Sequence, residues 1–164
     1  MSTTDDVLSN AEQYASSFDK GDLPMPPGRK LAVVACMDAR LIPTKVLGLQ
    51  EGDAHVIRNA GGVVTDDVVR SLAISQRRLG TEEILLIHHT DCGMQLITDG
   101  GFRAELQQAT GMAPSFAIES FRDVDADVRQ SMARVRNSPF LLHRDRVRGL
   151  VYDVNTRALR EIEP

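Results

Sequence analysis

Two short, uninterrupted apolar runs constrain the fold of this chain most strongly. They cover residues 31–35 and 84–87, and no polar side chain breaks either run. A continuous apolar run of this length is typical of a strand buried on both faces of a parallel sheet, whereas a strand with one solvated face alternates apolar and polar residues. We therefore expect both segments to lie inside a parallel sheet, with residues 54–57 as a shorter strand between them.

The segments around these strands predict helices and a final hairpin. Apolar residues recur with helical spacing in residues 4–18, 65–79, 102–108 and 121–136. Near the C-terminus, a strand and an antiparallel edge partner are expected over residues 149–154 and 158–162. Strands that alternate with helices favour an α/β fold. The expected architecture is a mainly parallel four-stranded sheet flanked by helices, with a C-terminal antiparallel edge strand.

Length and charge limit the classes of protein that fit. The 164 residues, of which 42% are apolar, suit one domain over residues 1–164, with an N-terminal helix and arm over residues 1–30. The arm is rich in proline and should be extended, so it can reach a neighbouring subunit. A net charge of -4 without basic runs argues against nucleic-acid binding. No apolar run could span a membrane and no signal-peptide pattern follows Met1, so we expect a cytoplasmic protein.

The two cysteines and one histidine form a candidate metal site. Cys36 and Cys92 each follow a predicted strand, and His89 precedes Cys92 by three residues. The carboxyl ends of parallel strands meet at one edge of a sheet, so these side chains should converge. Zinc favours thiolate and imidazole, and three protein ligands with one open position characterise catalytic zinc sites. Buried structural cysteines with a core histidine, or a redox pair, are the alternatives. Neighbouring His88 should face the other side of the strand and make a structural hydrogen bond.

Asp38 and Arg40 are candidate catalytic residues. They are one residue apart, so in an extended loop their side chains can project to the same side and form a charge-assisted pair. A solvated surface salt bridge is the alternative. Close to a zinc ligand, however, a carboxylate can bind the metal or accept a hydrogen bond from its water, and Arg40 would hold Asp38 off the metal.

Small residues at two strand ends are candidates for the walls of a substrate pocket. Ala60, Gly61 and Gly62 follow the second predicted strand, and Gly93 follows Cys92. Glycine allows the backbone to approach a compact ligand closely. A plain turn is the alternative for the glycine pair.

Three motifs together resemble the β-class carbonic anhydrases. They are Cys36-Met37-Asp38-Ala39-Arg40, Arg58-Asn59-Ala60-Gly61 and His89-Thr90-Asp91-Cys92-Gly93. The resemblance covers residues 31–94 in detail. It is closest to the short bacterial, actinobacterial-like branch, which also includes carbonyl sulfide hydrolase.

The resemblance implies an activity and a set of site residues. Cys36, His89 and Cys92 would bind Zn²⁺, and Asp38 with Arg40 would form the catalytic dyad. The implied reaction is the reversible hydration of carbon dioxide to bicarbonate and a proton by a zinc-bound hydroxide. A homodimer or homotetramer is implied as well.

Two other functions are open at this point. The same zinc site could hydrolyse a sulfur analogue, carbonyl sulfide or carbon disulfide, because relatives on this scaffold do so. A non-catalytic zinc-binding module would result if Asp38 closed the coordination shell permanently. Arg40 argues against that module, since a permanent ligand needs no competing partner.

Overall fold

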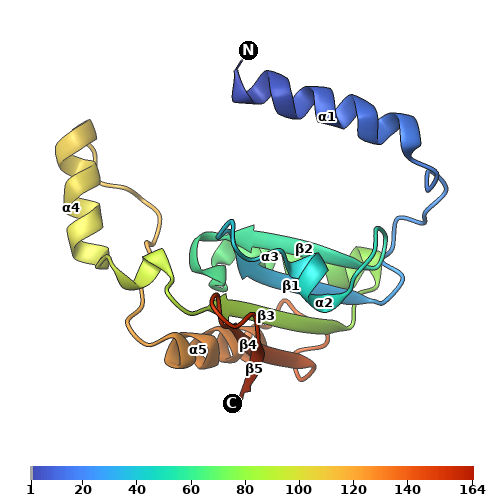
Figure 1. The fold of residues 1–164 in the computed structure, drawn as a ribbon. Coiled ribbons are helices and arrows are strands. Elements are labelled where there is room, and N and C mark those ends of the chain that lie inside the picture. Colours follow the sequence, from blue (N-terminus) through green and yellow to red (C-terminus); the bar gives the residue numbers. More distant parts are fainter. Residues whose placement is uncertain (1) are drawn as a thin grey trace.

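The computed structural model describes residues 2–164, and its centre is a five-stranded sheet (Figure 1). The strand order is β2-β1-β3-β4-β5. The strands are β1 (Leu31–Cys36), β2 (Ala54–Asn59), β3 (Glu83–His89), β4 (Val147–Tyr152) and β5 (Leu159–Ile162). The first four are parallel, and β5 runs antiparallel to β4. The predicted α/β architecture, four parallel strands and an antiparallel edge strand, is confirmed.

The two apolar runs of the sequence form the middle of this sheet. Strands β1 and β3 are neighbours, with Val33 opposite Leu85 and Val34 opposite Leu86. Val33 and Val34 are both completely buried although their side chains point to opposite faces. Each face of these strands is therefore covered, which is why neither run tolerates a polar residue.

Different elements cover the two faces. Helices α3 (Asp66–Leu79) and α5 (Val124–Asn137) contribute to one buried apolar cluster, to which the sheet adds Val34 and Leu86. The other cluster contains Val33 and the inner side chains of several loops, with partly buried residues of the short helix α2 (Pro43–Leu47) packed against it. The loops that follow β1 and β3 lie on this second side, so their residues are held against a packed core.

Three helices differ from the sequence-based expectation. Helix α2 was not predicted, because one turn and a half is too short to show an apolar periodicity. Helix α4 spans Asp99–Thr110 and is longer than the predicted 102–108, since the Thr98 hydroxyl accepts the Gly101 N–H (3.1 Å) and caps an earlier start. Helix α5 begins at Val124 instead of residue 121, because Asp123 caps it.

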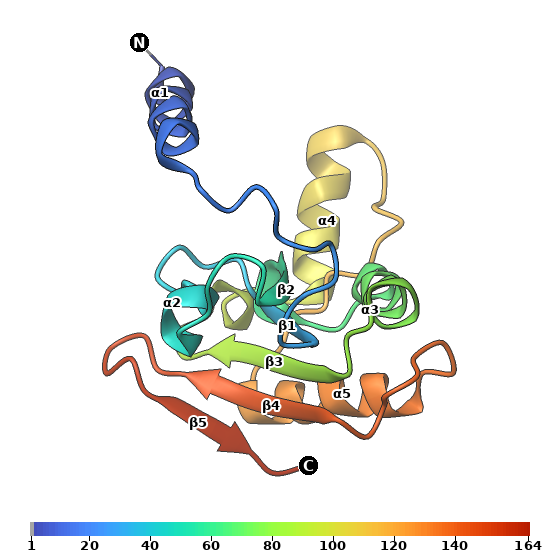
Figure 2. The same ribbon diagram turned by 90° about the vertical axis from the view of Figure 1, so that its right-hand side faces the viewer.

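Helices α1 (Thr3–Ser17) and α4 both project away from the sheet in the same general direction (Figures 1 and 2). Neither helix buries a residue. The apolar face of α1 is exposed to solvent at Val7, Leu8, Tyr14 and Phe18. The Tyr14 hydroxyl contacts the Glu51 carboxylate, but α1 shares no hydrophobic core with the rest of the chain.

Within residues 2–164, none of the helices combines the length and the apolarity needed to cross a membrane.

Candidate metal centre

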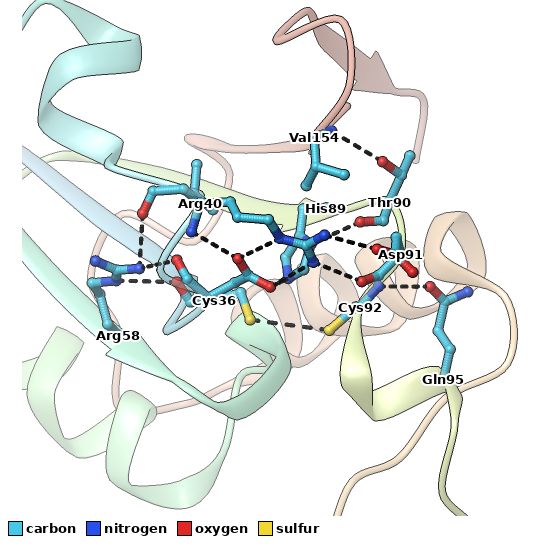
Figure 3. A network of polar contacts seen from close by, with 11 residues as sticks. Cys36, Arg40, Arg58, His89, Thr90, Asp91, Cys92, Gln95 and Val154 are labelled. Carbon is cyan, nitrogen blue, oxygen red and sulfur yellow. Dashed lines mark hydrogen bonds and ion pairs between the residues drawn. The ribbon is translucent and has the colours of Figure 1, made fainter.

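Three potential metal ligands meet at the carboxyl edge of the sheet (Figure 3). Cys36 is the last residue of β1, His89 is the last residue of β3, and Cys92 follows in the next loop. Their donor atoms all lie within 4.8 Å of one another, and all three residues are buried. No other group of this kind occurs in residues 2–164. The predicted convergence of Cys36, His89 and Cys92 is therefore what the structure shows.

The imidazole of His89 is arranged to present Nε2 to a metal. Its Nδ1 lies 2.8 Å from the Thr90 carbonyl oxygen, which can only accept, so the proton sits on Nδ1. Nε2 is buried, and no hydrogen-bond partner for it lies within residues 2–164. Thr90 is itself fixed, because its N–H donates to the Tyr152 carbonyl and its hydroxyl accepts the Val154 N–H. A buried, unpaired imidazole nitrogen is costly unless something binds it, and a metal ion fits this position.

The two sulfur atoms have the separation that one tetrahedral ion requires. Cys36 Sγ and Cys92 Sγ are 4.0 Å apart, and both cysteines are free. Two zinc–sulfur bonds of about 2.3 Å at a tetrahedral angle place their sulfurs about 3.8 Å apart. The hydrogen bond between the sulfurs lowers the pKa of Cys36 to about 4 and raises the pKa of Cys92. The pair therefore carries a shared negative charge near neutral pH, which suits a cation.

Asp38 and Arg40 form a two-pronged ion pair beside the three ligands. Arg40 Nε donates to Asp38 Oδ1 (3.0 Å) and Nη2 donates to Oδ2 (2.8 Å). These hydrogen bonds hold the pKa of Asp38 well below its usual range, so the carboxylate stays ionised. Asp38 Oδ2 lies 3.7 Å from His89 Nε2. The carboxylate is thus next to the three donor atoms but is held by Arg40. This position distinguishes the pair from an ordinary surface salt bridge.

Asp91 completes the environment of Arg40. Its carboxylate accepts Arg40 Nη1 (2.7 Å) and its carbonyl accepts Nη2 (2.9 Å). Arg40 is therefore held from the β3 side as well as by its own loop. Asp91 appears in the third sequence motif, but the sequence alone assigned it no role.

Two further residues contact the main chain of Cys36 and Cys92. Arg58 Nε donates to the Cys36 carbonyl (3.0 Å), and the Cys92 N–H donates to Gln95 Oε1 (3.2 Å). Gln95 Nε2 in turn donates to the Arg122 carbonyl (3.0 Å). Sequence analysis gave neither Arg58 nor Gln95 a function, because bonds to main-chain atoms leave no characteristic residue spacing.

The small residues have different environments. Gly62 has φ +73°, and a Cβ there would lie 2.8 Å from the Cys36 nitrogen and 2.9 Å from the Ile87 oxygen. Gly62 therefore lets its loop pack directly on the ends of β1 and β3. Ala60 lines a hollow of about 240 Å³. A Cβ added to Gly93 would meet only open space.

His88 faces away from the ligands, as its position next to His89 on a strand predicts. Its Nε2 lies 2.7 Å from Asp127 Oδ2 of α5, and its ring is completely buried. This pair connects β3 to α5, so the predicted structural hydrogen bond is confirmed.

Comparison with known proteins agrees with this geometry. A family model described as carbonic anhydrase matches residues 31–112. The chain is 56% identical over 164 residues to beta-carbonic anhydrase 1 of Mycobacterium tuberculosis, with 100% of both chains covered. It is 35% identical to the carbon disulfide hydrolase of Acidianus sp., over 96% of this chain and 87% of that protein.

A solved structure has the same fold as this chain. The carbonic anhydrase of Streptococcus mutans superimposes with a TM-score of 0.92 at 40% identity, and the match covers 99% of both chains. Sequence and fold agree over the full length, and the residues that carry the motifs meet at one site. The chain therefore belongs to the β-carbonic anhydrase family.

Proposed function

We propose that this protein catalyses the zinc-dependent, reversible hydration of carbon dioxide to bicarbonate and a proton. One observation supports it most: the buried, unpaired Nε2 of His89 faces two cysteine sulfurs beside an ionised carboxylate. The 56% identical relative is named as a β-carbonic anhydrase. Zinc held by this donor set supplies a nucleophilic oxygen near neutral pH, because it lowers the pKa of water.

The residues of the chain have separate roles in this proposal. Cys36, His89 and Cys92 bind the zinc ion. Asp38 would accept a hydrogen bond from the reacting water and thereby direct an oxygen lone pair toward carbon dioxide. Arg40 keeps the Asp38 carboxylate ionised and holds it in place, so that it does not become a further ligand.

Walls for a small apolar substrate are available nearby. We assign this role to Ala60, Gly61, Gly62 and Gly93. Gly93 leaves open space where a side chain would lie, whereas Gly61 and Gly62 let the wall pack closely on the residues behind it.

Hydrolysis of carbon disulfide or carbonyl sulfide is the second candidate. The Acidianus relative, at 35% identity, is named as a carbon disulfide hydrolase. The ligand set and dyad suit that reaction too, because it also requires water to attack the carbon of a linear molecule.

Parallel assays on one preparation test both candidates. Zinc per chain is measured by mass spectrometry, and turnover of carbon dioxide, carbonyl sulfide and carbon disulfide is measured at several pH values. We expect about one zinc per chain and the highest kcat/KM for carbon dioxide. Stoichiometric zinc without turnover of any substrate would favour a non-catalytic zinc module, and absence of zinc binding would refute both enzymatic candidates.

We also propose that α1 packs against a second copy of the chain. Its apolar face is unpartnered, and it carries Asp5, Asp6 and Glu12 with no basic residue. The outer side of α3 offers a complementary surface, a mostly apolar hollow whose lining includes Ile74, the two arginines Arg70 and Arg77, and one acidic residue, Asp66.

Light scattering tests this assembly. We expect the full chain to be a homodimer or homotetramer, and a variant that lacks residues 2–20 to dissociate. Ile74→Glu should weaken the assembly as well. A monomeric full-length protein, or an unchanged assembly in both variants, would refute this proposal.

A further inference from the structure

Arg58 binds the loop that carries both a metal ligand and the dyad. Its Nε donates to the Cys36 carbonyl (3.0 Å), and its Nη2 donates to the carbonyls of Asp38 (2.8 Å) and Leu41 (2.8 Å). Figure 3 shows the guanidinium against this loop, on the side away from Cys92. One side chain thus reaches the first, middle and last parts of the segment 36–41.

The guanidinium of Arg58 makes its hydrogen bonds to this loop. Within residues 2–164, no carboxylate lies within ion-pair distance of it. Its charge is therefore directed at carbonyl dipoles. Hydrogen bonds from a charged donor are stronger than neutral ones, and the rigid fork of arginine fixes the relative positions of its acceptors.

The other contacts of the loop do not replace this anchor. Arg40 binds Asp38, and the Leu41 N–H donates to the Asp38 carbonyl (3.0 Å), but both bonds lie within the loop. Only the bond from the Met37 N–H to the Asn59 carbonyl (2.8 Å) also ties these residues to β2. Internal bonds shape the loop. Arg40 also ties its side chain to Asp91 after β3, but Arg58 is the side chain that binds the main chain of the loop and so sets where that main chain lies relative to the sheet.

We propose that Arg58 is a positioning residue for the metal centre and the dyad. It fixes the carbonyls of Cys36 and Asp38 and so sets the direction of the sulfur and of the carboxylate on the same loop. This inference rests on the proposed metal-dependent function. It does not require Arg58 to touch substrate or metal.

Three variants and a metal with a visible spectrum test the proposal. Arg58→Ala removes the fork and Arg58→Lys keeps the charge without it. Arg148→Ala is the matched control, because Arg148 is an exposed arginine on β4 that pairs with Glu161 (2.7 Å). The zinc-free proteins are titrated with cobalt(II), and the dissociation constant and the ligand-field spectrum are recorded. Thermal unfolding shows whether each variant is folded.

Arg58→Ala should bind cobalt(II) about 10- to 100-fold more weakly, the usual effect of losing a residue that orients a metal ligand. Its spectrum should differ from that of the unchanged protein. Arg58→Lys should stay impaired, since an ammonium cannot bridge three carbonyls in the same geometry. Arg148→Ala should match the unchanged protein in both readouts.

Unchanged cobalt affinity and spectrum in Arg58→Ala would overturn the proposal. Full cobalt affinity and an unchanged spectrum in Arg58→Lys would also overturn it, because charge alone would then suffice. If Arg58→Ala does not fold, the result for Arg58→Lys decides whether the proposal holds. Neither readout depends on turnover. If the unchanged protein binds cobalt(II) but hydrates no carbon dioxide, the proposed function fails while the role of Arg58 is still tested.

Discussion

Replacement of Arg40 by alanine should separate catalysis from metal binding. Arg40 makes two side-chain hydrogen bonds to Asp38 and two to Asp91, and none to Cys36, His89 or Cys92. Arg40→Ala should therefore retain zinc. What it loses is the restraint on the Asp38 carboxylate, which lies 3.7 Å from His89 Nε2 and could then turn toward the metal.

Protonation of Asp38 does not account for the expected loss. Arg40 lowers the pKa of Asp38, so removing Arg40 lets that pKa rise toward the ordinary value of about 3.9. Asp38 is still ionised at pH 7. The change is in the position of the carboxylate, and loss of a positioned proton acceptor lowers the rate by about 10²- to 10⁴-fold. That corresponds to about 3–5 kcal/mol in the activation free energy.

The cost to stability is smaller. The Arg40 side chain is 47% exposed, so water replaces much of what its ion pairs provide. An exposed pair stabilises a fold by at most about 1 kcal/mol, which lowers Tm by about 2–4 °C in a protein of this size. A domain with about 5–15 kcal/mol of stability stays folded after such a change. Unfolding therefore cannot explain a hundredfold loss of activity.

The assay measures carbon dioxide hydration by stopped flow with a pH indicator, together with zinc content and Tm. Arg148→Ala is the matched control, because Arg148 makes a similar two-pronged pair with Glu161 at the far edge of the sheet. We expect a comparable small change in Tm for both variants, and a loss of activity only for Arg40→Ala. Full activity with full zinc content in Arg40→Ala would refute the role given to this residue.

Three further predictions concern the ligands and the fold. Cys36→Ser should abolish tight zinc binding, as measured by metal analysis after desalting, and stoichiometric zinc would show that Cys36 is not a ligand. Gln95→Ala frees the Cys92 N–H and should weaken cobalt(II) binding about 10-fold. Arg160 lowers the pKa of Asp125, so their pair stabilises the fold above about pH 4 and is lost as the pH falls and Asp125 is protonated. Asp125→Asn should therefore cost about 0.5–1 kcal/mol in urea unfolding at pH 7 and less as the pH falls below about 4, and a cost that does not change with pH would contradict this.

The sheet and the ligand cluster were predictable because burial imposes a strong pattern. The middle parts of strands β1 and β3 are covered on both faces, so the runs 31–35 and 84–87 contain no polar residue. Parallel strands end at one edge, which brings Cys36 next to His89 and Cys92 although more than fifty residues separate them in sequence. Local residue type and simple topology were sufficient for these features.

The supporting contacts were not predictable in the same way. Arg58 and Gln95 act on main-chain atoms, which every residue has, so no particular residue type marks their partners. Helix α4 begins before its predicted start because the Thr98 cap outweighs two unfavourable glycines in its first turn. Contacts of this kind depend on where the chain lies in three dimensions.

Gly62 imposes a steric constraint on the evolution of this protein. Any side chain there would press on the Cys36 nitrogen and the Ile87 oxygen, and both are main-chain atoms that cannot rotate away. Every single-nucleotide change of this codon that alters the amino acid would therefore push apart the strand ends that bear Cys36 and His89. Selection should remove such alleles even though glycine contributes no functional group. The small size of this one residue thus maintains the distance between the strand ends that carry Cys36 and His89.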